Sequence, residues 1–462
     1  MQLAILIAVI LALAQVETSA AEPTGGALWR AALTFIGVLV APLAAALGSM
    51  RLLRELARDE APDPSRCERV WSRVQSIAVG IWLAIVVATM FVLKWPQVVR
   101  SDWALASWPL ADELVILLPV IAPLVLLWCV LHRLHGAAQK SLARGQAPPR
   151  PQQPLAAFLW QNARHHLALA LLPALAVIGW QESLALVWPG IARGGLWIYL
   201  PVLAGMLILL PVALRHVWRT SPLPAGPLRE RLDSICRGQR VGVREILVWH
   251  TDFQMANAAV AGVLRGVRYV FLTDGLLARL TPAEVEAVLR HELGHIAGRH
   301  MLWRILLLAW PLVMWIAAHE AWPEALAALS QGLSQTGLTE PVQMSLLVPL
   351  ALAAYAIVVV GTYSRWLEHD ADLATCVWPG GQVDRAAAEA FARALIKIVG
   401  RGRESVWSLW LHPSAFSRIA TLVQATKEPQ WALRFRRRLA WAAMTIALGY
   451  VAAALIMASA GR

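Results

Sequence analysis

The segment His291-Glu292-Leu293-Gly294-His295 contains the residues of this chain whose types and spacing most directly indicate chemistry. Residues four apart share one face of an α-helix, so His291 and His295 can both point at one metal ion. Glu292 is then turned toward the position of a metal-bound water, from which a carboxylate can take a proton. Two imidazole ligands and a carboxylate base are typical of a zinc metallopeptidase. The motif predicts one zinc ion per chain, with Glu292 as the general base.

The residues before this motif predict the helix that must carry it. Thr281-Pro282-Ala283-Glu284 offers an N-cap hydroxyl, a proline at the first helical position and a glutamate at the third, which together form a capping box. Apolar residues follow at mostly helical spacing, namely Val285, Val288, Leu289 and Ile296. The alternative is an ordinary amphipathic helix with two surface histidines. Acidic residues further along the chain favour the metal site.

The composition places this helix in a membrane protein. Hydrophobic residues make up 58% of the chain and charged residues 15%, whereas a typical soluble domain has about 25% charged residues. The mean hydropathy is +0.56. We expect membrane spans at Ala31–Met50, Ser76–Leu93, Leu114–Leu131, Leu167–Trp188, Leu196–Leu214, Leu302–Ala318, Ser345–Gly361 and Leu439–Ser459. Pro173 and Glu182 interrupt the fourth of these, which is either a kinked span or a shorter re-entrant segment.

The distribution of basic residues predicts the orientation of these spans. Arginine and lysine gather in loops 51–73 and 132–166, whereas loop 95–113 holds only Arg100 and loop 319–344 holds neither residue type. By the positive-inside rule, the basic loops face the cytoplasm. The net charge of +12 is thereby explained without a nucleic-acid partner, because the basic residues form no single patch. We expect an integral membrane protein of the bacterial inner membrane, embedded in the lipid bilayer; a eukaryotic internal membrane is the alternative.

The predicted topology points to a third ligand. Two spans follow the metal helix, so the chain returns to the same side of the membrane and meets a helical stretch that contains Glu368 and Asp372. These two residues share a helix face. Glu368 is the predicted third zinc ligand, and Asp372 is placed to accept the N–H of a zinc-bound imidazole. The alternative is a solvated acidic face near Arg365, and His369 and Asp370 are expected to be bystanders.

These motifs resemble a known family. The motif His291–His295 followed by His300, and the pattern S-R-x-x-E-x-x-A-D at Ser364–Asp372, resemble the integral-membrane gluzincin zinc metallopeptidases that include the CAAX prenyl protease and the HtpX heat-shock protease. Further similar segments are His250–Asp252, Asn257-Ala258, Gly262, Tyr269–Leu277, His412–Ser414 and Arg418-Ile419, with one extra residue between the last two. The resemblance covers Arg215–Leu422.

The resemblance implies a mainly α fold. We expect a polytopic α-helical membrane protein with a gluzincin-type α+β zinc peptidase domain, which consists of a small sheet and the H-E-x-x-H helix. The expected order is a signal peptide or N-terminal anchor at 1–30, a transmembrane bundle of about five spans at 31–214, the first catalytic part at 215–300, a transmembrane hairpin at 301–362, the second catalytic part at 363–438 and a C-terminal span at 439–462.

Two further catalytic residues are implied by the resemblance. His412 and Arg418 are the candidates for the hydrogen-bond donors that stabilise the oxyanion of the reaction. His412 could instead cap a helix in the loop beside Pro413. We expect His300, which lies past the useful turn of the metal helix, to pack or to contact the membrane surface.

Substrate binding is expected beside the metal helix. Asn257, Ala258 and Gly262 lie in a segment of small residues that predicts an exposed edge strand, and an extended peptide can add to such an edge. The alternative is an ordinary strand in a small sheet with Glu245–Trp249 and Tyr269–Leu272.

The combined features predict a zinc-dependent metalloendopeptidase (EC 3.4.24 type) that hydrolyses peptide bonds of membrane-associated or unfolded polypeptides at the cytoplasmic face. Two alternatives belong to other classes. A signalling metallopeptidase that cleaves a dedicated cytoplasmic partner is disfavoured by the short outside loops, of which 319–344 is the longest. A non-catalytic membrane scaffold or transporter is disfavoured by the intact Glu292. No feature of the sequence indicates an oligomeric state.

Overall fold

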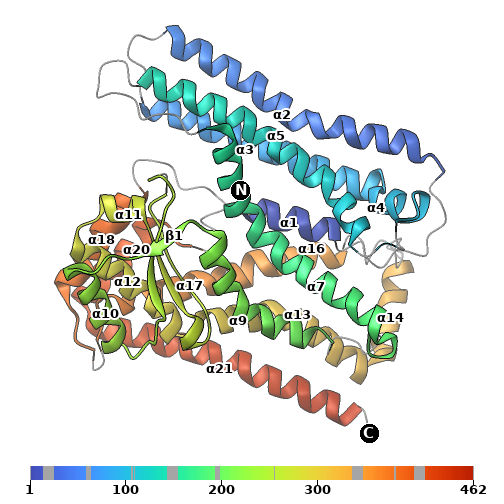
Figure 1. The fold of residues 1–462 in the computed structure, drawn as a ribbon. Helices are drawn as coiled ribbons and strands as arrows, with labels where there is room; N and C mark the ends of the chain where they lie inside the picture. The colour runs from blue at the N-terminus through green and yellow to red at the C-terminus, as the bar shows by residue number, and fades with distance from the viewer. Residues whose placement is uncertain are drawn as a thin grey trace. The chain divides into compact units, whose positions relative to one another are not determined.

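The computed structural model describes residues 2–13, 25–58, 64–105, 108, 110–142, 154–192, 198–253, 255–335, 347–378, 381–399 and 412–460. Three parts of the sequence predictions lie outside these residues. They are the first residues of two predicted spans, at 196–197 and 345–346, and the small-residue stretch of the N-terminal segment. The chain forms two compact units, Met1–Trp218 and Arg219–Arg462 (Figure 1).

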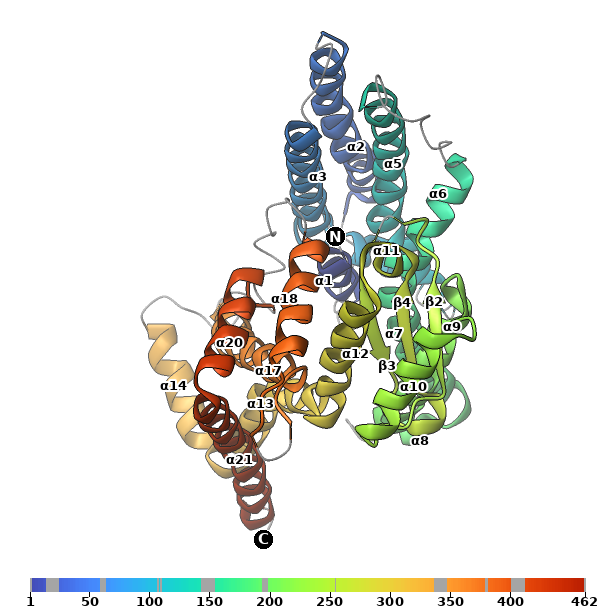
Figure 2. The ribbon, with the colours of Figure 1, turned by 90° about the vertical axis from the view of Figure 1, so that its left-hand side faces the viewer.

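The described part of the first unit consists of helices and short connections between them. Its α-helices are α1 (Gln2–Leu13), α2 (Ala27–Arg58), α3 (Pro64–Val87), α4 (Trp95–Gln97), α5 (Ala111–Leu142), α6 (Leu155–Asn162), α7 (Ala168–Val187), α8 (Pro189–Ala192) and α9 (Leu200–Val217). Helices α2, α3 and α5 pack side by side (Figures 1 and 2). Three fully buried tryptophans fill their core, at Trp82, Trp95 and Trp128. The Trp82 indole donates to the carbonyl of Val120 at 3.0 Å, so its polar group is satisfied inside the apolar bundle.

Eight helices among the described residues are long and apolar enough to cross a membrane, and the prediction of a polytopic α-helical membrane protein is confirmed. They are Ala27–Met50, Arg73–Val92, Ala111–Arg133, Ala170–Val187, Leu200–Val217, His300–Ala321, Leu350–Ala374 and Pro429–Ser459. The segment whose span was in question forms one continuous helix, α7, with Pro173 inside it.

The second unit contains a four-stranded sheet in the order β1-β2-β4-β3. Its strands are β1 (Thr220–Pro222), β2 (Glu245–Trp249), β3 (Ala258–Ala261) and β4 (Tyr269–Thr273). Strands β2 and β4 pair in parallel, and β1 and β3 pair antiparallel at the two edges. The sequence predicts no strand at β1, which lies at the start of a proline-rich segment. Proline is compatible with an edge strand because its missing N–H can lie on the unpaired side.

The helices of this unit cover the sheet and extend from it. They are α10 (Pro227–Gly238), α11 (Asp274–Arg279), α12 (Pro282–Ala297), α13 (His300–Ala321), α14 (Pro323–Gln335), α16 (Val348–Tyr355), α17 (Gly361–Ala374), α18 (Arg385–Val399), α20 (Ala415–Lys427) and α21 (Pro429–Ala460). Helix α12, which carries the histidine motif, contacts β3, α17 and α18. A π-helical turn, Ala356–Val360, joins α16 to α17 without a break.

Helices α12 and α17 approach closely at a glycine. A Cβ atom on Gly294 would lie 2.7 Å from the Cβ of Ala374 and 3.2 Å from the Cα of Ala371. Such distances are shorter than ordinary van der Waals contacts between carbon atoms. The small residues at this crossing therefore let the two helices that carry the predicted ligands come together.

The beginning of α12 is stabilised by Glu284, as the capping-box sequence predicts. Its carboxylate accepts from the backbone N–H of Thr281 at 2.8 Å and from Nζ of Lys397, on α18, at 2.7 Å. Glu284 is only 1% exposed. One carboxylate thus caps the start of α12 and links this helix to α18.

We expect Glu284→Ala to lower the free energy of unfolding by about 0.5–2 kcal/mol, because it removes the cap of α12 and the bond to Lys397. The matched control is Glu286→Ala, which removes a surface pair with Arg231 at 3.4 Å and should cost at most about 0.5 kcal/mol. Thermal unfolding of the two variants, followed by near-ultraviolet circular dichroism, measures the difference. Equal midpoints would show that the Glu284 cap does not stabilise α12.

Candidate metal centre

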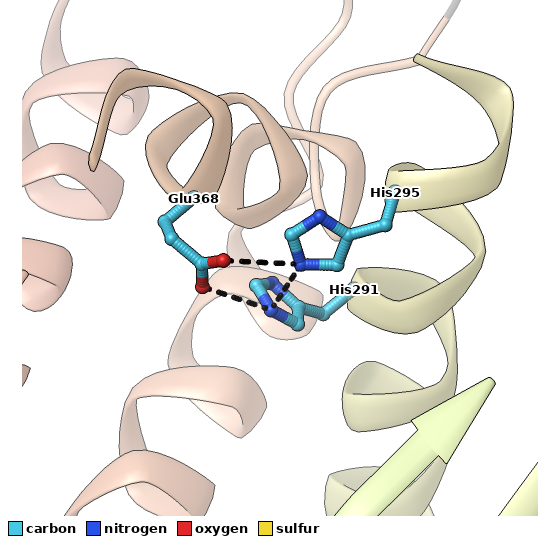
Figure 3. A group of neighbouring side chains, drawn as sticks. All are labelled: His291, His295 and Glu368. Atoms are coloured by element: carbon cyan, nitrogen blue, oxygen red, sulfur yellow. Dashed lines mark hydrogen bonds and ion pairs between the residues drawn. The ribbon is translucent and has the colours of Figure 1, made fainter. Parts of the chain in front are cut away.

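His291, His295 and Glu368 converge on one point, although Glu368 comes from a different helix (Figure 3). The Nε2 atoms of the two histidines are 3.2 Å apart. The Glu368 carboxylate lies 3.8 Å from Nε2 of His291 and 3.6 Å from Nε2 of His295. The Glu368 side chain is 2% exposed, so this carboxylate is buried among the groups that could neutralise it.

The distances fit a tetrahedral metal ion. Atoms bound at about 2.0–2.2 Å from a tetrahedral zinc ion lie about 3.3–3.6 Å from each other. The two Nε2 atoms lie near the lower end of that range, and the nearest carboxylate oxygens, Oε2 for His291 and Oε1 for His295, lie at or just above its upper end. Two imidazole nitrogens and one carboxylate are also the donor set of a catalytic zinc site with one position left for water. The three residues therefore suit zinc in both chemistry and spacing.

Glu292 lies on the same helix, between the two histidines in sequence, and is partly buried. Burial raises the pKa of its carboxyl to about 7, with the Glu368 carboxylate adding to the rise, while His291, Arg418 and His412 oppose it. A carboxylate with a raised pKa is a stronger base than one in water. Its environment thus suits proton transfer near neutral pH.

Asp372 orients the first histidine. Its Oδ1 lies 3.1 Å from Nδ1 of His291, so that it can accept the ring hydrogen and leave Nε2 free for a metal. Arg418 from α20 donates to the same carboxylate, with Nη2 2.6 Å from Oδ1, and its guanidinium also lies over the ring of Phe391. The structure thus places Arg418 against Asp372 and beside His291. Its role as an oxyanion donor stays a prediction.

Glu368 has a hydrogen-bond donor at each oxygen. Nδ1 of His412 lies 3.0 Å from Oε2, and Nη2 of Arg304 donates to Oε1 at 2.7 Å. The His412 side chain is 55% exposed, so it reaches the site from the solvent side. Arg304 was not predicted from the sequence. The only signal was a lone arginine in the first turns of an apolar helix, which is more commonly an interfacial residue.

His300 is buried and packs beside His295, which is the first of the two expected alternatives. It begins α13 after a tight turn in which Arg299 has a positive φ of 52°. The His300 side chain is 1% exposed and also contacts Asp370, a residue that the sequence predicts to be a bystander. The chain folds back on itself between α12 and α13, which no local pattern indicates.

Of the predicted substrate residues, Ala258 lies in the edge strand β3, and Asn257 and Gly262 flank this strand. Strand β3 pairs with β4 on one side only, and the Asn257 carbonyl accepts from the backbone N–H of Thr273 at 3.0 Å. Gly262 has φ +117°, and a Cβ there would lie 2.4 Å from the carbonyl oxygen of Val267. This glycine is therefore required by the backbone itself. Substrate contacts at Asn257, Ala258 and Gly262 stay predictions.

Comparison with known proteins agrees with this geometry. Residues 228–426 match peptidase family M48. A protease HtpX homolog from Moorella thermoacetica is 29% identical over 148 residues, which are 30% of this chain and 46% of that protein. Protease HtpX homolog 2 from Methanosarcina mazei is 46% identical over 48 residues, which are 10% of this chain and 16% of that protein. The chain therefore spans less than half the length of these curated relatives.

Among solved structures, the crystal structure of S. mikatae Ste24p matches 87% of this chain and 100% of its own, with a TM-score of 0.49 and 15% sequence identity.

We expect the purified protein to hold about one divalent metal ion per chain. His295→Ala and Glu368→Ala should each lose it on dialysis, because two remaining ligands bind far more weakly than three. The control is His319→Ala, which changes a histidine on α13 outside the site. Elemental analysis decides the matter. Full metal occupancy in Glu368→Ala would exclude Glu368 as a ligand.

Proposed function

We propose that this chain, in which residues 228–426 match peptidase family M48 and eight described helices could span a membrane, is a zinc metalloendopeptidase that hydrolyses membrane-associated or unfolded polypeptides at the cytoplasmic face. The observation that carries the proposal is the convergence of His291, His295 and Glu368, with Glu292 on the same helix turn. A metal bound by these three side chains would have its open position near a basic carboxylate, and this arrangement serves peptide hydrolysis.

The residues around the site have distinct roles in this proposal. A zinc ion held by His291, His295 and Glu368 would acidify a bound water and polarise the substrate carbonyl. Glu292 takes a proton from the water as it attacks, and later gives a proton to the leaving nitrogen. His412, exposed and within hydrogen-bond distance of Glu368, is the donor best placed to face an oxyanion from the solvent side.

Strand β3 is the proposed binding edge for an extended substrate. It belongs to the sheet that α12 packs against, and its outer edge has no partner strand within the sheet. Its residues are alanines and one valine, three of them partly exposed. A peptide added to this edge would be held by backbone hydrogen bonds, which carry little sequence preference. Broad recognition of unfolded polypeptides suits such binding.

The proposed location is a bacterial inner membrane with the active site in the cytoplasm. Its support is the charge pattern of the loops: basic residues occupy the segments on the side of the metal helix, whereas loop 319–344 has none. The same dispersed pattern argues against a nucleic-acid partner. A signalling peptidase with a dedicated partner would share this site and differ in its substrate range.

We expect Glu292→Gln to keep its metal and its thermal stability while proteolysis falls by about 10²–10⁴-fold, the contribution of general acid–base catalysis. Glutamine is nearly isosteric with glutamate but cannot act as a base near neutral pH. The assay is cleavage of an unfolded reporter in detergent, with and without a zinc chelator. The control Glu286→Gln removes another carboxylate from α12 and should cut at the wild-type rate.

Two outcomes of this assay would contradict the proposal. Chelator-sensitive cleavage that survives in Glu292→Gln would show that another group is the base. A wild-type protein that binds zinc but cleaves nothing in a broad panel of unfolded and membrane-anchored polypeptides would favour the scaffold interpretation.

The topology can be tested with single cysteines in a variant that lacks the native thiols. Arg231 and Glu389 have exposed side chains on the two catalytic parts, and Gly332 is exposed on α14. We expect an impermeant thiol reagent to label positions 231 and 389 from the cytoplasmic side and position 332 from the opposite side. Labelling of positions 332 and 389 from one side would refute the proposed hairpin.

A further inference from the structure

Each of the two histidines of α12 needs a hydrogen-bond acceptor at its Nδ1 atom, but the two Nδ1 atoms face different residues. Their Nε2 atoms face each other and Glu368, so in a metal-binding tautomer the ring hydrogen of each must lie on Nδ1. An acceptor at Nδ1 fixes the tautomer and the orientation of the ring. For His291 the acceptor is the Asp372 carboxylate. The atom that faces Nδ1 of His295, at 2.9 Å, is instead Nδ1 of His300.

The direction of this hydrogen bond follows from the chemistry. Because Nδ1 of His295 must donate, Nδ1 of His300 must accept, and the hydrogen of a neutral His300 ring then lies on its Nε2. That Nε2 lies 3.2 Å from Oδ2 of Asp370. The other oxygen of Asp370 accepts from Nε of Arg436 at 3.0 Å. Every contact in the series from His295 to Arg436 thus has a donor and an acceptor.

The burial of His300 and Asp370 favours this pattern of hydrogen bonds over bonds to water. His300 is 1% exposed, and the Asp370 side chain is 15% exposed, so water competes weakly for their hydrogen bonds. The rings of His295 and His300 have centroids 5.0 Å apart and are nearly perpendicular. The residues come from three helices, since His300 begins α13, Asp370 is on α17 and Arg436 is in the second turn of α21.

We propose that His300, held by Asp370 and Arg436, is a positioning residue that sets the tautomer and orientation of His295 and thereby the affinity of the metal site. This proposal depends on the proposed function in one respect, namely that the site binds a metal. In this proposal, His300 and its partners fix the ring of His295 as Asp372 and Arg418 fix the ring of His291. It also makes the beginning of α21, the last candidate span, part of the support of the metal ligands.

The test uses the full-length protein in detergent with His300→Phe, which fills the same buried space without a nitrogen, and His300→Gln, whose amide oxygen can accept a hydrogen bond. We expect His300→Phe to weaken zinc binding by about 10–100-fold, the usual cost of losing such a partner. The absorption spectrum of the cobalt-substituted protein should change, because the His295 ring is no longer fixed. His300→Gln should recover part of both properties.

A merely structural role predicts a different result. In that case His300→Phe would lower the melting temperature of the metal-free protein while zinc affinity, measured by competition with a chromophoric chelator, and the cobalt spectrum stay as in the wild type. That outcome overturns the proposal. If His300→Phe fails to fold, the same measurements on Asp370→Asn decide, since this change weakens the support of His300 without altering the ring.

The link to α21 has its own matched pair. Arg436→Gln should weaken zinc binding in the same direction as His300→Phe but less, because Asp370 keeps its bond to His300. Arg434→Gln changes an exposed arginine that pairs with Glu428 on the surface and should leave zinc affinity unchanged. A wild type without metal would refute the proposed function, whereas a metal-binding wild type with unaffected His300 and Arg436 variants would refute only the positioning role.

Discussion

The close contact between α12 and α17 is the constraint on which the metal centre depends. The first helix carries the two histidines and the second carries both carboxylates, so the site exists only where the two helices touch. At Gly294 there is no room for a side chain larger than hydrogen against Ala371 and Ala374. Packing in protein interiors is tight enough that one added carbon displaces its neighbours. Small residues at this crossing thereby allow the ligands on the adjoining turns of the two helices to approach each other.

The second physical requirement is charge compensation. Glu368 and Asp372 are almost completely buried, and an isolated buried carboxylate is strongly destabilising. Arg304 and His412 contact the first, and Arg418 and His291 contact the second. Because the partners come from α12, α13, α20 and the segment before α20, these charges connect most of the second unit. Removal of one partner would leave a buried charge unmatched, which costs more than the pair contributes.

Sequence reasoning reached the parts of the site that follow local rules or topology. The helix of His291 and His295 has its start encoded in its own first turn, and Glu368 follows from the need for a ligand on the same side of the membrane. The partners Arg304, His300 and Asp370 could not be found in this way. Their positions depend on the sharp turn at Arg299 and on the packing of α13 and α21 against α17, which are set by long-range contacts. The sequence did not predict strand β1 for a related reason. This edge strand forms by pairing with β2 and has no strong hydrophobic pattern of its own.

The continuity of α16 and α17 bears on how the molecule is made. The helix that brings Glu368 continues α16 without interruption within the candidate span Leu350–Ala374, and it is synthesised after α13 and α14. A nascent chain that has emerged only as far as α12 holds two of the three ligands, and two ligands retain a metal poorly. The centre can therefore be completed only when translation has passed the segment between α13 and α17. The order of synthesis itself thus delays the metal centre until the second of its two ligand helices has been made.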